Sequence, residues 1–525
     1  MIADSIATIS DFGAVGDGVT NDAAAVQLAL NSGATVVDGE GKTYGLSSTL
    51  TVASPIEIRN AKFKWVGSLS QNMFSVTADD VTFSSIEIDG DGAAMRGIFA
   101  DVTSDLTVQN SKIKNLYYDG SLSLTGLSAW VAGIFVQGDC SRITVSNCSI
   151  QNLNPVWDGT AVEKDDSTAR GVLCVAASGH PTSVRIVGNY ISNITGSSGV
   201  GVHILSTLTG SYYEDADFFI SGNVIEGANN RAFKIQASNG AITGNQHLLG
   251  LGVMAAFLTT HSLSDMAGFF NAKASANVIS SENVAVSNNQ FDASGYTSCC
   301  LVSDASQYVT ITGNTLKNTT ARTPTSSVAT LTGSIDCVYD GNTCLGGARG
   351  LYILGAAVQN MVSNNKFISS TEAGIYVDGA SNENTITDNT LTGTGTSLAL
   401  INNQDSNDNH ITDNVSYIAN VPAVRMVGTS EGCILSGNRA KSTSAALAVS
   451  FVGSTADVNG AYDNDRMNRL YEVAAWPITY GKYNTGDVIK VRTGTPGDYL
   501  FYTCRFGGEY GTGTLPVFTQ SAVIV

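Results

Sequence analysis

The sequence predicts an all-β protein: a right-handed, single-stranded parallel β-helix, or solenoid, with a short N-terminal capping helix and a small C-terminal β segment. Three observations predict this fold. The composition is typical of strands and turns, one short motif recurs about every 24 residues, and each repeat carries at least two strands of alternating apolar and polar residues.

The composition favours strands and turns over helices. The 525-residue chain contains 55 glycines, only 8 prolines and 14% charged residues, and Asn, Ser and Thr recur between short Val and Ile runs. A chain of this length exceeds a typical globular domain, so we expect either several domains or one repetitive domain. The composition favours the repetitive domain.

A short motif, represented by residues 309–316, supplies the repeat. It reads apolar, any, apolar, two small or polar residues, Asn, any, apolar. Its Asn position is filled by Asn189, Asn223, Asn245, Asn289, Asn314, Asn342, Asn365, Asn389, Asn414 and Asn438, and in two earlier repeats by Ser111 and Cys148. A regular period near 24 residues means that each repeat buries its apolar face by stacking on its neighbours.

Leucine-rich repeats share such a period and a stacked Asn, but they place a helix or 3₁₀ turn in the second half of each repeat. Here the second half is another alternating strand, as in residues 350–354, 374–378 and 423–427. Strands of this kind, rich in Val, Ile and Thr, indicate a parallel β-helix. The recurring asparagines then form an inward ladder that satisfies polar groups at a turn, and not a catalytic site.

Repeat length distinguishes the two halves of the chain. The motif positions at 111, 148, 189 and 223, and again those at 245 and 289, are separated by about 34 to 44 residues, whereas later repeats stay near 24. Loops inserted into a rigid scaffold are the usual carriers of binding and chemistry. We therefore expect the first half to provide the working face.

Charge and cysteine usage exclude several classes of function. A net charge of −18 without a basic cluster excludes nucleic acid as a partner, and no segment is suited to membrane insertion or secretion. No motif requires a metal or another cofactor. Five cysteines occupy strand positions that suit small apolar side chains, so we expect free, buried thiols at Cys174, Cys300, Cys337, Cys344 and Cys433.

The opening of the chain carries a family resemblance. Residues 9–44 contain Ile-Ser-Asp-Phe-Gly-Ala-Val-Gly-Asp-Gly-Val-Thr-Asn-Asp, then Ala-Ala-Ala-Val-Gln-Leu-Ala-Leu and later Gly-Lys-Thr-Tyr. This segment resembles the opening of pectin-lyase-like β-helix proteins, a superfamily that includes bacteriophage tailspikes.

The physical chemistry of this segment agrees with the resemblance. Thr20, Asn21 or Asp22 can cap a short helix. That helix would carry Val26 and Leu30 on one face and cover the open end of the first coil.

The resemblance also implies a domain plan. Residues 1–45 would form the N-terminal cap and the entry to the β-helix, residues 46–460 the β-helix with its substrate-binding face, and residues 461–525 a small C-terminal β domain that helps trimerisation. A tailspike of this kind is a homotrimer. Because few residues precede the opening segment, we expect a phage tail or baseplate attachment protein to hold it, unless an attachment domain has been removed.

Alignment of the strands by their apolar alternation predicts a column of outward side chains. In the insertion-rich half this column contains Phe135, Leu173, His203 and Lys234, and in the regular half Leu301, Tyr352, Tyr376 and Arg425. Neighbours in such a column are about 4.8 Å apart. Outward aromatic and cationic side chains suit a sugar chain with acidic groups, and an ordinary solvent-facing surface is the alternative.

Acidic residues crowd the loops beside this column. The candidate catalytic carboxyls are Glu214, Asp215, Asp217 and Glu226, and the candidate substrate-binding residues are His203, Lys234, Trp157, Tyr212, Tyr213 and Arg231. Glycoside hydrolysis needs one protonated and one ionised carboxyl, and the sequence leaves the pair open. For any single acid, a solvated loop position is the alternative reading.

A polysaccharide lyase would need different roles. His203, Lys234 or Tyr212 would remove a proton beside a uronate carboxylate, and a cation would stabilise the enolate. His247 lies two residues after Asn245, at an inward position, so we interpret it as structural.

The resemblance and these residues together predict a tailspike of the virion tail that binds and depolymerises bacterial surface polysaccharide, either capsule or O-antigen. Glycoside hydrolysis is the first expectation and β-elimination the second. A glycan-binding adhesin without catalysis is the non-enzymatic alternative. A bacterial pectin-type enzyme is a further one, which the lack of a secretion signal disfavours.

Overall fold

The fold is a right-handed parallel β-helix, as the sequence predicts. The computed structural model describes residues 5–156, 167–177, 179–206, 215–248, 274–294, 301–319, 327–393, 398–418, 421–430 and 432–440, with further strands between residues 449 and 524. Each full coil adds one strand to each of three parallel sheets, called sheets A, B and C below. The chain divides into two compact units, unit 1 (Met1–Ser298) and unit 2 (Cys299–Val525).

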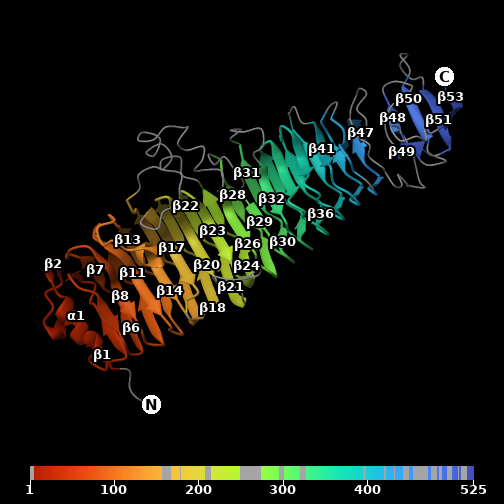
Figure 1. Cartoon of the computed structure of the whole chain (residues 1–525). Helices are drawn as coiled ribbons and strands as arrows, with labels where there is room; N and C mark the ends of the chain where they lie inside the picture. The colour runs from red at the N-terminus through yellow and green to blue at the C-terminus, as the bar shows by residue number, and fades with distance from the viewer. Residues whose placement is uncertain are drawn as a thin grey trace. The chain divides into compact units, whose positions relative to one another are not determined.

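Unit 1 contains the insertion-rich coils, stacked side by side in Figure 1. Its sheet A consists of β1 (Ile6–Thr8), β3 (Val36–Asp38), β6 (Ile56–Arg59), β9 (Val81–Ser84), β12 (Thr107–Gln109), β15 (Ser141–Ser146), β18 (Thr182–Val187), β21 (Asp215–Ser221), β24 (Ser238–Thr243) and β27 (Val284–Ser287). Its sheet B consists of β2 (Asp17–Asn21), β4 (Thr43–Leu46), β7 (Lys62–Trp65), β10 (Glu87–Asp89), β13 (Lys112–Leu116), β16 (Ser149–Leu153), β19 (Tyr190–Ile194), β22 (Val224–Ala228), β25 (Gln246–Leu248) and β28 (Gln290–Asp292). Its sheet C consists of β5 (Leu50–Val52), β8 (Ser70–Val76), β11 (Ala94–Asp101), β14 (Val131–Gln137), β17 (Thr168–Val175), β20 (Ser198–Leu205), β23 (Arg231–Gln236) and β26 (Ala274–Ile279).

Unit 2 repeats the same three-strand coil. Its sheet A consists of β30 (Thr310–Thr312), β33 (Val338–Asp340), β36 (Met361–Ser363), β39 (Thr385–Thr387), β42 (His410–Thr412) and β45 (Ile434–Ser436). Its sheet B consists of β31 (Thr315–Asn318), β34 (Thr343–Gly346), β37 (Lys366–Ile368), β40 (Thr390–Thr392), β43 (Val415–Ser416) and β46 (Arg439–Ala440). Its sheet C consists of β29 (Leu301–Asp304), β32 (Ser327–Thr332), β35 (Arg349–Leu354), β38 (Ala373–Val377), β41 (Ala399–Gln404), β44 (Val424–Val427) and β47 (Val449–Val452).

The last strands of unit 2 belong to two separate sheets. A four-stranded sheet contains β48 (Tyr471–Val473), β50 (Val488–Arg492), β51 (Tyr499–Phe506) and β53 (Val517–Ile524), and a two-stranded sheet pairs β49 (Lys482–Tyr483) with β52 (Gly508–Glu509). Unlike the coils, these strands include antiparallel pairs, such as β50 with β51. A trimerising role for this region stays a prediction.

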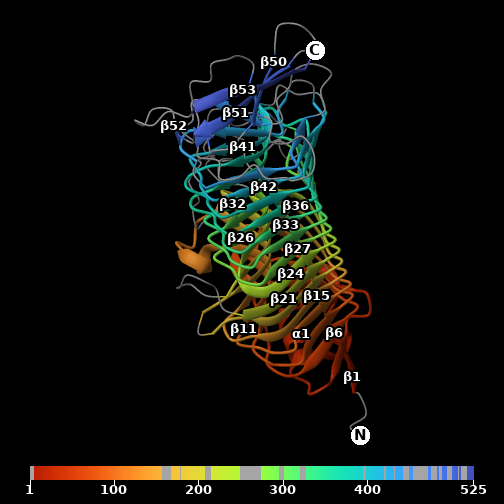
Figure 2. The same cartoon turned by 90° about the vertical axis from the view of Figure 1, so that its right-hand side faces the viewer.

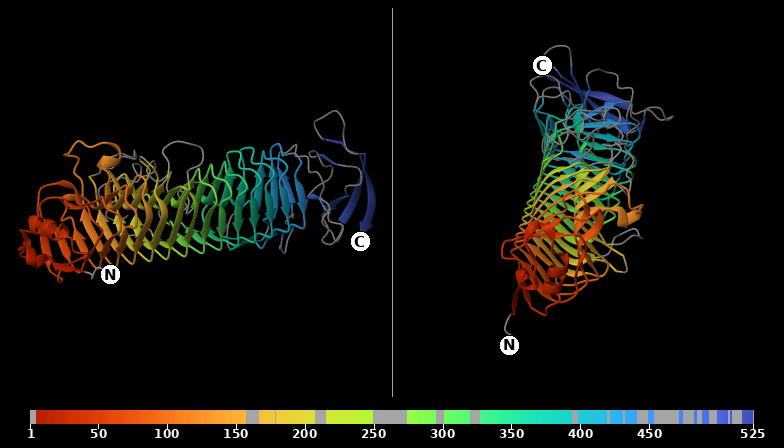
Figure 3. Two further views of the ribbon diagram at one scale, coloured as in Figure 1. Left: turned by 90° about the horizontal axis from the view of Figure 1, so that it is seen from below. Right: turned by 90° about the vertical axis from the view of Figure 1, so that its left-hand side faces the viewer.

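One short helix lies at the first coil of unit 1, as the sequence predicts. It is α1 (Ala23–Leu30), with Asp22 at its N-cap position and with Val26 and Leu30 buried. Gln27 donates from Nε2 to a main-chain oxygen of β5 at 2.9 Å and accepts a main-chain N–H of β5 at 2.8 Å. The helix therefore packs on the first coil of unit 1 (Figures 1 and 3). Within the described residues, no helix is long and apolar enough to cross a membrane.

The predicted asparagine ladder is present at the turn between sheets A and B. In one rung the main-chain N–H and the Nδ2 of Asn365 both donate to the Oδ1 of Asn389, at 3.0 and 2.9 Å, and the Nδ2 also donates to the carbonyl of Tyr339 at 2.9 Å. The same pattern connects Asn189, Asn223, Asn245 and Asn289 in unit 1 and Asn314, Asn342, Asn365, Asn389, Asn414 and Asn438 in unit 2. Ser111 accepts from the coil before it, and Cys148 donates to the ladder of the coil after it, as the motif predicts.

A second ladder lies just before sheet A in unit 2, where the sequence analysis did not predict one. The Oδ1 of Asn360 accepts the main-chain N–H of Cys337, and Asn360 donates in turn to Asn384, which donates to Asn409. All three asparagines are buried. Polar groups are thus satisfied at both ends of the sheet A strands, which lets short strands stack without unpaired buried groups.

The described cysteines are free and buried, as predicted for Cys174, Cys337, Cys344 and Cys433. Cys300 lies outside the described residues. Burial raises the pKa of the Cys344 thiol to about 12, so this sulfur stays protonated and unreactive at neutral pH.

Candidate functional site

Three glycines lie where the strands of sheet C in unit 1 approach closely. A Cβ on Gly133 would lie 2.7 Å from the carbonyl oxygen of Gly171, and one on Gly171 would lie 2.5 Å from that of Gly201. Only glycine fits this close approach, and the three strands pair in one register around it. That register aligns the residues that follow each glycine across β14, β17 and β20.

The predicted column on sheet C is confirmed as an alignment. Phe135, Leu173, His203 and Lys234 are successive partners across β14, β17, β20 and β23. The first three are fully or almost fully buried, however, and do not form an open strip. Trp130 and Leu127 pack over Phe135 and Leu173 from the insertion before β14. That insertion includes η2 (Gly126–Ala129), the orange helical turn that projects from the coils in Figure 2.

His203 is held by both ring nitrogens. Arg170 Nε donates to its Nδ1 at 3.1 Å, which places the ring proton on Nε2, and Nε2 then donates to Gln236 Oε1 at 3.1 Å. Burial, followed by the charges of Lys234 and Arg170, lowers the pKa of His203 well below its ordinary value. The imidazole is therefore neutral at physiological pH.

Trp130 joins this cluster from the insertion. Its ring stacks on the His203 ring at a centroid distance of 6.2 Å and an interplanar angle of 22°, and the Arg170 guanidinium carbon lies 4.6 Å from its centroid. Arg170 is 1% exposed and also donates to the carbonyls of Ala169 and Ser198. We call Trp130, Arg170, His203 and Gln236 the Trp130 cluster.

Arg96 was not among the predicted site residues, yet it holds the insertion before β14 in place. Its guanidinium donates to the carbonyls of Leu127 at 2.7 Å, Ser128 at 2.9 Å and Trp130 at 3.2 Å, which closes the C-terminal end of η2. Its guanidinium carbon lies 4.4 Å from the Phe135 ring centroid. Burial lowers the pKa of Arg96 to about 10, so it keeps its charge at neutral pH.

A register signal could have identified these arginines. Arg96, Ala132, Arg170, Val200 and Arg231 are successive partners on sheet C, three residues before the predicted column. Arg231, a predicted substrate-binding residue, is 7% exposed in this second column, and Lys234 is half-buried beside His203. The structure thus brings together His203, Lys234 and Arg231, but largely beneath the surface.

The candidate acids do not share that face. Asp215 and Asp217 lie on β21 in sheet A, and Glu226 lies on β22 in sheet B. Asp217 is held by Arg185, at 3.0 Å between Oδ2 and NH2, and by the Ser183 hydroxyl at 2.9 Å. These three carboxyls therefore do not cluster beside His203 on sheet C, as the sequence analysis had expected.

Glu226 has a separate role on sheet B, where its Oε2 accepts the Tyr190 hydroxyl at 2.8 Å. This hydrogen bond is the first cause of the raised pKa of Tyr190. The other predicted site residues, Glu214, Trp157, Tyr212 and Tyr213, lie outside the described residues.

The matching column in unit 2 is confirmed for Tyr352, Tyr376 and Arg425; Tyr352 and Arg425 are half-buried, and Tyr376 is 8% exposed. Tyr352, Tyr376, Asn402 and Arg425 are successive partners on sheet C. The residues next to these tyrosines in sequence point into the core, since Leu351, Ile353 and Ile375 are fully buried. Leu301, which the sequence alignment placed in this column, is instead fully buried and pairs with Ala329.

An arginine organises the two tyrosines. The guanidinium carbon of Arg349 lies 4.2 Å from the Tyr352 ring centroid and 3.8 Å from that of Tyr376, and the two rings meet edge to face at 5.5 Å. Arg349 is oriented by Glu372 through hydrogen bonds of 2.7 and 3.2 Å. We call Arg349, Tyr352, Tyr376 and Glu372 the Tyr352 cluster.

The edges of the Tyr352 cluster are polar. The Tyr352 hydroxyl donates to Asp378 at 3.3 Å and the Tyr376 hydroxyl to Gln404 at 2.5 Å. Burial raises the pKa of both tyrosines, so they remain neutral hydrogen-bonding groups. Arg425 donates to Asn402 at 2.7 Å, and no carboxylate among the described residues pairs with it.

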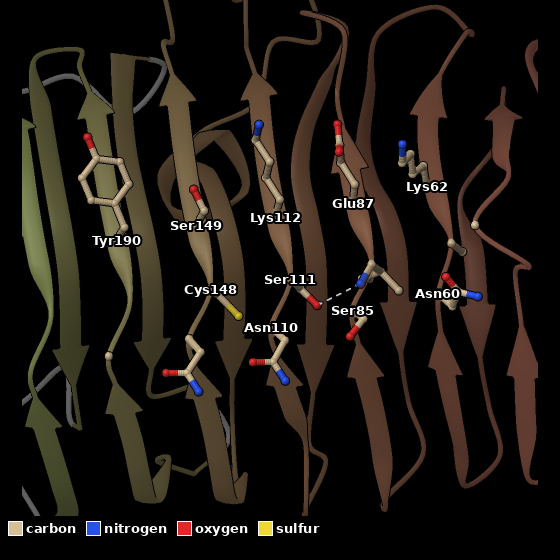
Figure 4. Close-up of a pocket in the computed structure, with 15 residues that line it drawn as sticks. Asn60, Lys62, Ser85, Glu87, Asn110, Ser111, Lys112, Cys148, Ser149 and Tyr190 are labelled. Carbon is tan, nitrogen blue, oxygen red and sulfur yellow. Dashed lines mark hydrogen bonds between the residues drawn. The ribbon is translucent and has the colours of Figure 1, made fainter.

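Unit 1 also has a groove on a different face from sheet C, at the turn between sheets A and B. Its volume is about 560 Å³, and its outer row consists of Lys62, Glu87, Lys112, Ser149 and Tyr190 from β7, β10, β13, β16 and β19 (Figure 4). Neither the composition nor the motif spacing drew attention to this row.

Family models match two parts of the sequence. Residues 31–218 match the right-handed β-helix region family, and residues 259–438 match a family described as periplasmic copper-binding protein (NosD). Among the described residues no group of three His, Cys, Asp or Glu side chains could hold a metal ion, so these residues do not fit a copper centre. No curated protein sequence matches the chain.

Solved structures share the fold at low sequence identity. PfbA, a surface adhesin of Streptococcus pneumoniae, aligns with a TM-score of 0.51 and 16% identity over 72% of this chain and 93% of that one. Tailspike protein 3 of bacteriophage CBA120 aligns at 0.45 and 13% over 98% and 70%, and the A-module of the Azotobacter vinelandii mannuronan C-5 epimerase AlgE4 at 0.39 and 12% over 74% and 96%. At these identities the likeness shows the fold, that of right-handed parallel β-helix proteins.

Proposed function

We propose that this protein is a bacteriophage tailspike that binds a bacterial surface polysaccharide, capsule or O-antigen, along the outer face of sheet C and depolymerises it. One observation carries the proposal: on sheet C of unit 2, two tyrosine rings and Arg425 stand in one register. Aromatic rings pack on the apolar faces of sugars, and a guanidinium binds carboxylates. The expected ligand is therefore an acidic polysaccharide.

Unit 1 supports the same proposal in a different way. Its sheet C face carries the Trp130 cluster, Arg231 and Lys234, and the insertion before β14 packs over it. Insertions on a rigid scaffold suit a catalytic role, because they shape a site without disturbing the coils that hold it. We assign cutting to this face of unit 1 and extended binding to the Tyr352 cluster.

Hydrolysis is the first form of the cutting step, and it needs a protonated and an ionised carboxyl. Asp217 is ion-paired with Arg185, and Glu226 is engaged by Tyr190 on sheet B, so neither suits the protonated role beside His203. Glu214, which precedes β21 in the chain, becomes the first candidate among the four predicted acids, with Asp215 next to it.

Elimination by a lyase is the second form, with His203 as the base. The motivation is the cationic surrounding of His203, since Arg170, Lys234 and Arg231 could stabilise an enolate. The obstacle is that both ring nitrogens are already engaged. An adhesin that binds without cutting is the rival function, and the separation of Asp217 and Glu226 onto two sheets favours it.

The proposal includes assembly and location. We propose a homotrimer, attached to the virion tail through a tail or baseplate protein and acting at the bacterial surface. Sedimentation of the purified full chain tests the trimer, because a monomer at micromolar concentration would contradict it.

The experiment that tests the function is incubation of the full chain with a panel of extracted capsules and lipopolysaccharides that includes the host's own. Fragment size, new reducing ends and the ultraviolet absorbance of unsaturated uronates are followed together. New reducing ends without that absorbance establish a hydrolase, and a rise in absorbance establishes a lyase. Binding without shortening establishes the adhesin, and no binding to any glycan overturns the proposal.

Single variants then assign the acids. Loss of cutting in Glu214→Gln with retained binding supports its role, whereas full activity in Glu214→Gln, Asp215→Asn, Asp217→Asn and Glu226→Gln, each tested alone, overturns the acid assignment. Loss of activity in His203→Ala, with the fold retained, would move the assignment to the lyase.

A further inference from the structure

The groove at the turn between sheets A and B in unit 1 is a second candidate binding surface, on a different face from sheet C. Its rim is formed by corner residues in the left-handed backbone conformation: Asn60, Ser85, Asn110, Asn147 and Gly188, with φ values of 51°, 54°, 51°, 53° and 68°. Such a conformation turns the chain from one sheet into the next within very few residues. Because the turn repeats in every coil, the concave surface runs along the β-helix axis.

The length of the groove suits a chain molecule. Its lining comes from β7, β10, β13, β16 and β19, which are neighbours in sheet B. At about 4.8 Å between strands, these strands span roughly 19 Å. A polymer laid along the axis would meet a new side chain of the outer row at each coil, as the row in Figure 4 shows.

The groove carries two lysines that form no ion pair among the described residues of this acidic protein. Its charged lining residues are Lys62, Glu87 and Lys112. Glu87 is ion-paired with Lys114, at 2.6 Å between Oε1 and Nζ, and Lys114 also pairs with Asp89 at 3.2 Å. Among the described residues neither Lys62 nor Lys112 has an ion-pair partner, in a chain whose net charge is −18. The two lysines stand on the strands either side of Glu87, in register with it, and neither forms an ion pair with it.

The remaining lining adds hydrogen-bonding groups and one aromatic ring. Asn110 and Asn147 are exposed at the corner, and Ser149 continues the outer row. Tyr190 ends the row, 37% exposed, with its ring fixed by the hydrogen bond to Glu226. Amides, hydroxyls and a fixed aromatic ring are the groups that bind sugar hydroxyls and sugar faces.

We propose that this groove is a second glycan-binding site, which holds an acidic polysaccharide along the β-helix axis through Lys62 and Lys112 at its acidic groups and Tyr190 at a sugar face. The class of ligand rests on the proposed function. The site itself is independent of sheet C, since it lies at another turn of the coil. It would retain a polysaccharide while the sheet C face of the same subunit acts on another part of the same polysaccharide chain.

The first experiment maps lysine reactivity in the full-length protein. An amine-reactive label is applied with and without polygalacturonate or hyaluronate, and each lysine is quantified by mass spectrometry. Lys62 and Lys112 are expected to be protected at least threefold. Lys366 is the internal control, because it starts a sheet B strand in unit 2, at the equivalent position, outside the groove. Equal protection of Lys366, or none at Lys62 and Lys112, overturns the proposal.

The second experiment measures affinity for the same polymers. The double variant Lys62→Gln/Lys112→Gln is expected to bind about five- to thirtyfold more weakly, with a shallower salt dependence, as expected for two solvent-exposed ion pairs. Lys366→Gln is the matched control and keeps wild-type affinity. Unchanged affinity of the double variant contradicts the site. A change of oligomeric state in that variant, measured by sedimentation, would instead make the groove a contact between copies of the chain.

The two proposals fail in distinguishable ways. If the variant Tyr352→Ala/Tyr376→Ala binds and cuts like the wild type while Lys62 and Lys112 remain protected, the sheet C proposal fails and the groove stands. If cutting and binding depend on sheet C but Lys62 and Lys112 react equally with and without polymer, the groove fails and the proposed function stands.

Discussion

The sheet C faces of the two units share one contact, in which an arginine guanidinium lies on an aromatic ring, but the ring comes from a different part of the chain in each unit. In unit 1 the guanidinium of Arg170 lies on the ring of Trp130, which comes from an insertion and is half-buried, and Arg170 and His203 are 1% exposed beneath it. In unit 2 the guanidinium of Arg349 lies on Tyr352 and Tyr376, which the strands themselves supply; Tyr352 is half-buried and Tyr376 is 8% exposed. The comparison teaches that the coil provides the cation in both units, whereas the aromatic ring comes from an insertion in unit 1 and from the strands themselves in unit 2.

The largest difference is expected from removing the two arginines. Arg170→Ala would leave His203 Nδ1 and the Ser198 carbonyl without their donor inside the protein, and should lower the free energy of unfolding by about 3 to 5 kcal/mol. Arg349→Ala should cost about half as much, because Glu372 is 23% exposed and can be hydrated. Chemical denaturation of both variants measures the difference. Equal losses would contradict the contrast between a guanidinium with only buried partners and one whose partner Glu372 can be hydrated.

The next largest loss of stability is expected from removing an asparagine of the ladder. Because the ladder repeats, any regular coil should show a similar loss. Asn365→Ala removes the acceptor of the Asn342 main-chain N–H and the donor to the Tyr339 carbonyl, both buried, and should cost about 3 kcal/mol. Asp388→Asn, at an exposed corner of the next coil with φ of 56°, is the control and should change stability by less than about 0.5 kcal/mol. A shift in denaturation midpoint as small as the control's would contradict the role of the ladder.

Acid sensitivity should reside in unit 1, where the described buried histidines lie. Burial lowers the pKa of His247 to about 4. Since the unfolded chain takes up the proton near pH 6.5, stability is full above that pH and falls as the pH drops towards 4, by up to about 3 kcal/mol. His247→Phe, flanked in its column by Ile225 and Phe291, should remove this term.

Unfolding curves between pH 7 and pH 4 test this prediction for unit 1. His410→Gln, at an exposed position in unit 2, is the control that should retain the acid sensitivity of the wild type. A wild-type protein that loses no more stability in acid than the His247→Phe variant would show that His247 is not the cause.

Much of the fold could be predicted because a stacked coil repeats its own geometry. The spacing of asparagines at one corner fixed the period, and the alternation of the strands fixed the columns on sheet C, including Tyr352 and Tyr376. The second ladder has the same period, at Asn360, Asn384 and Asn409, but it lies at a corner where no fixed motif surrounds it.

The site was less predictable because its arrangement is not local. The segment between His203 and Lys234 passes through β21 in sheet A and β22 in sheet B, so Asp217 and Glu226 are carried to other faces even though they are close in sequence. The burial of His203 likewise depends on Trp130, from an insertion two coils earlier in the stack. Neither periodicity nor composition contains that information.

The measurement that tests the central claim most directly is the affinity of Tyr352→Ala/Tyr376→Ala for a capsule or O-antigen polysaccharide that the wild-type protein binds, titrated by calorimetry beside the Lys366→Gln control. We predict at least a tenfold loss for the tyrosine variant, about 1.4 kcal/mol, and none for the control. Equal affinity of the tyrosine variant and the wild type, with both proteins folded, would contradict the claim that the outer face of sheet C binds the polysaccharide.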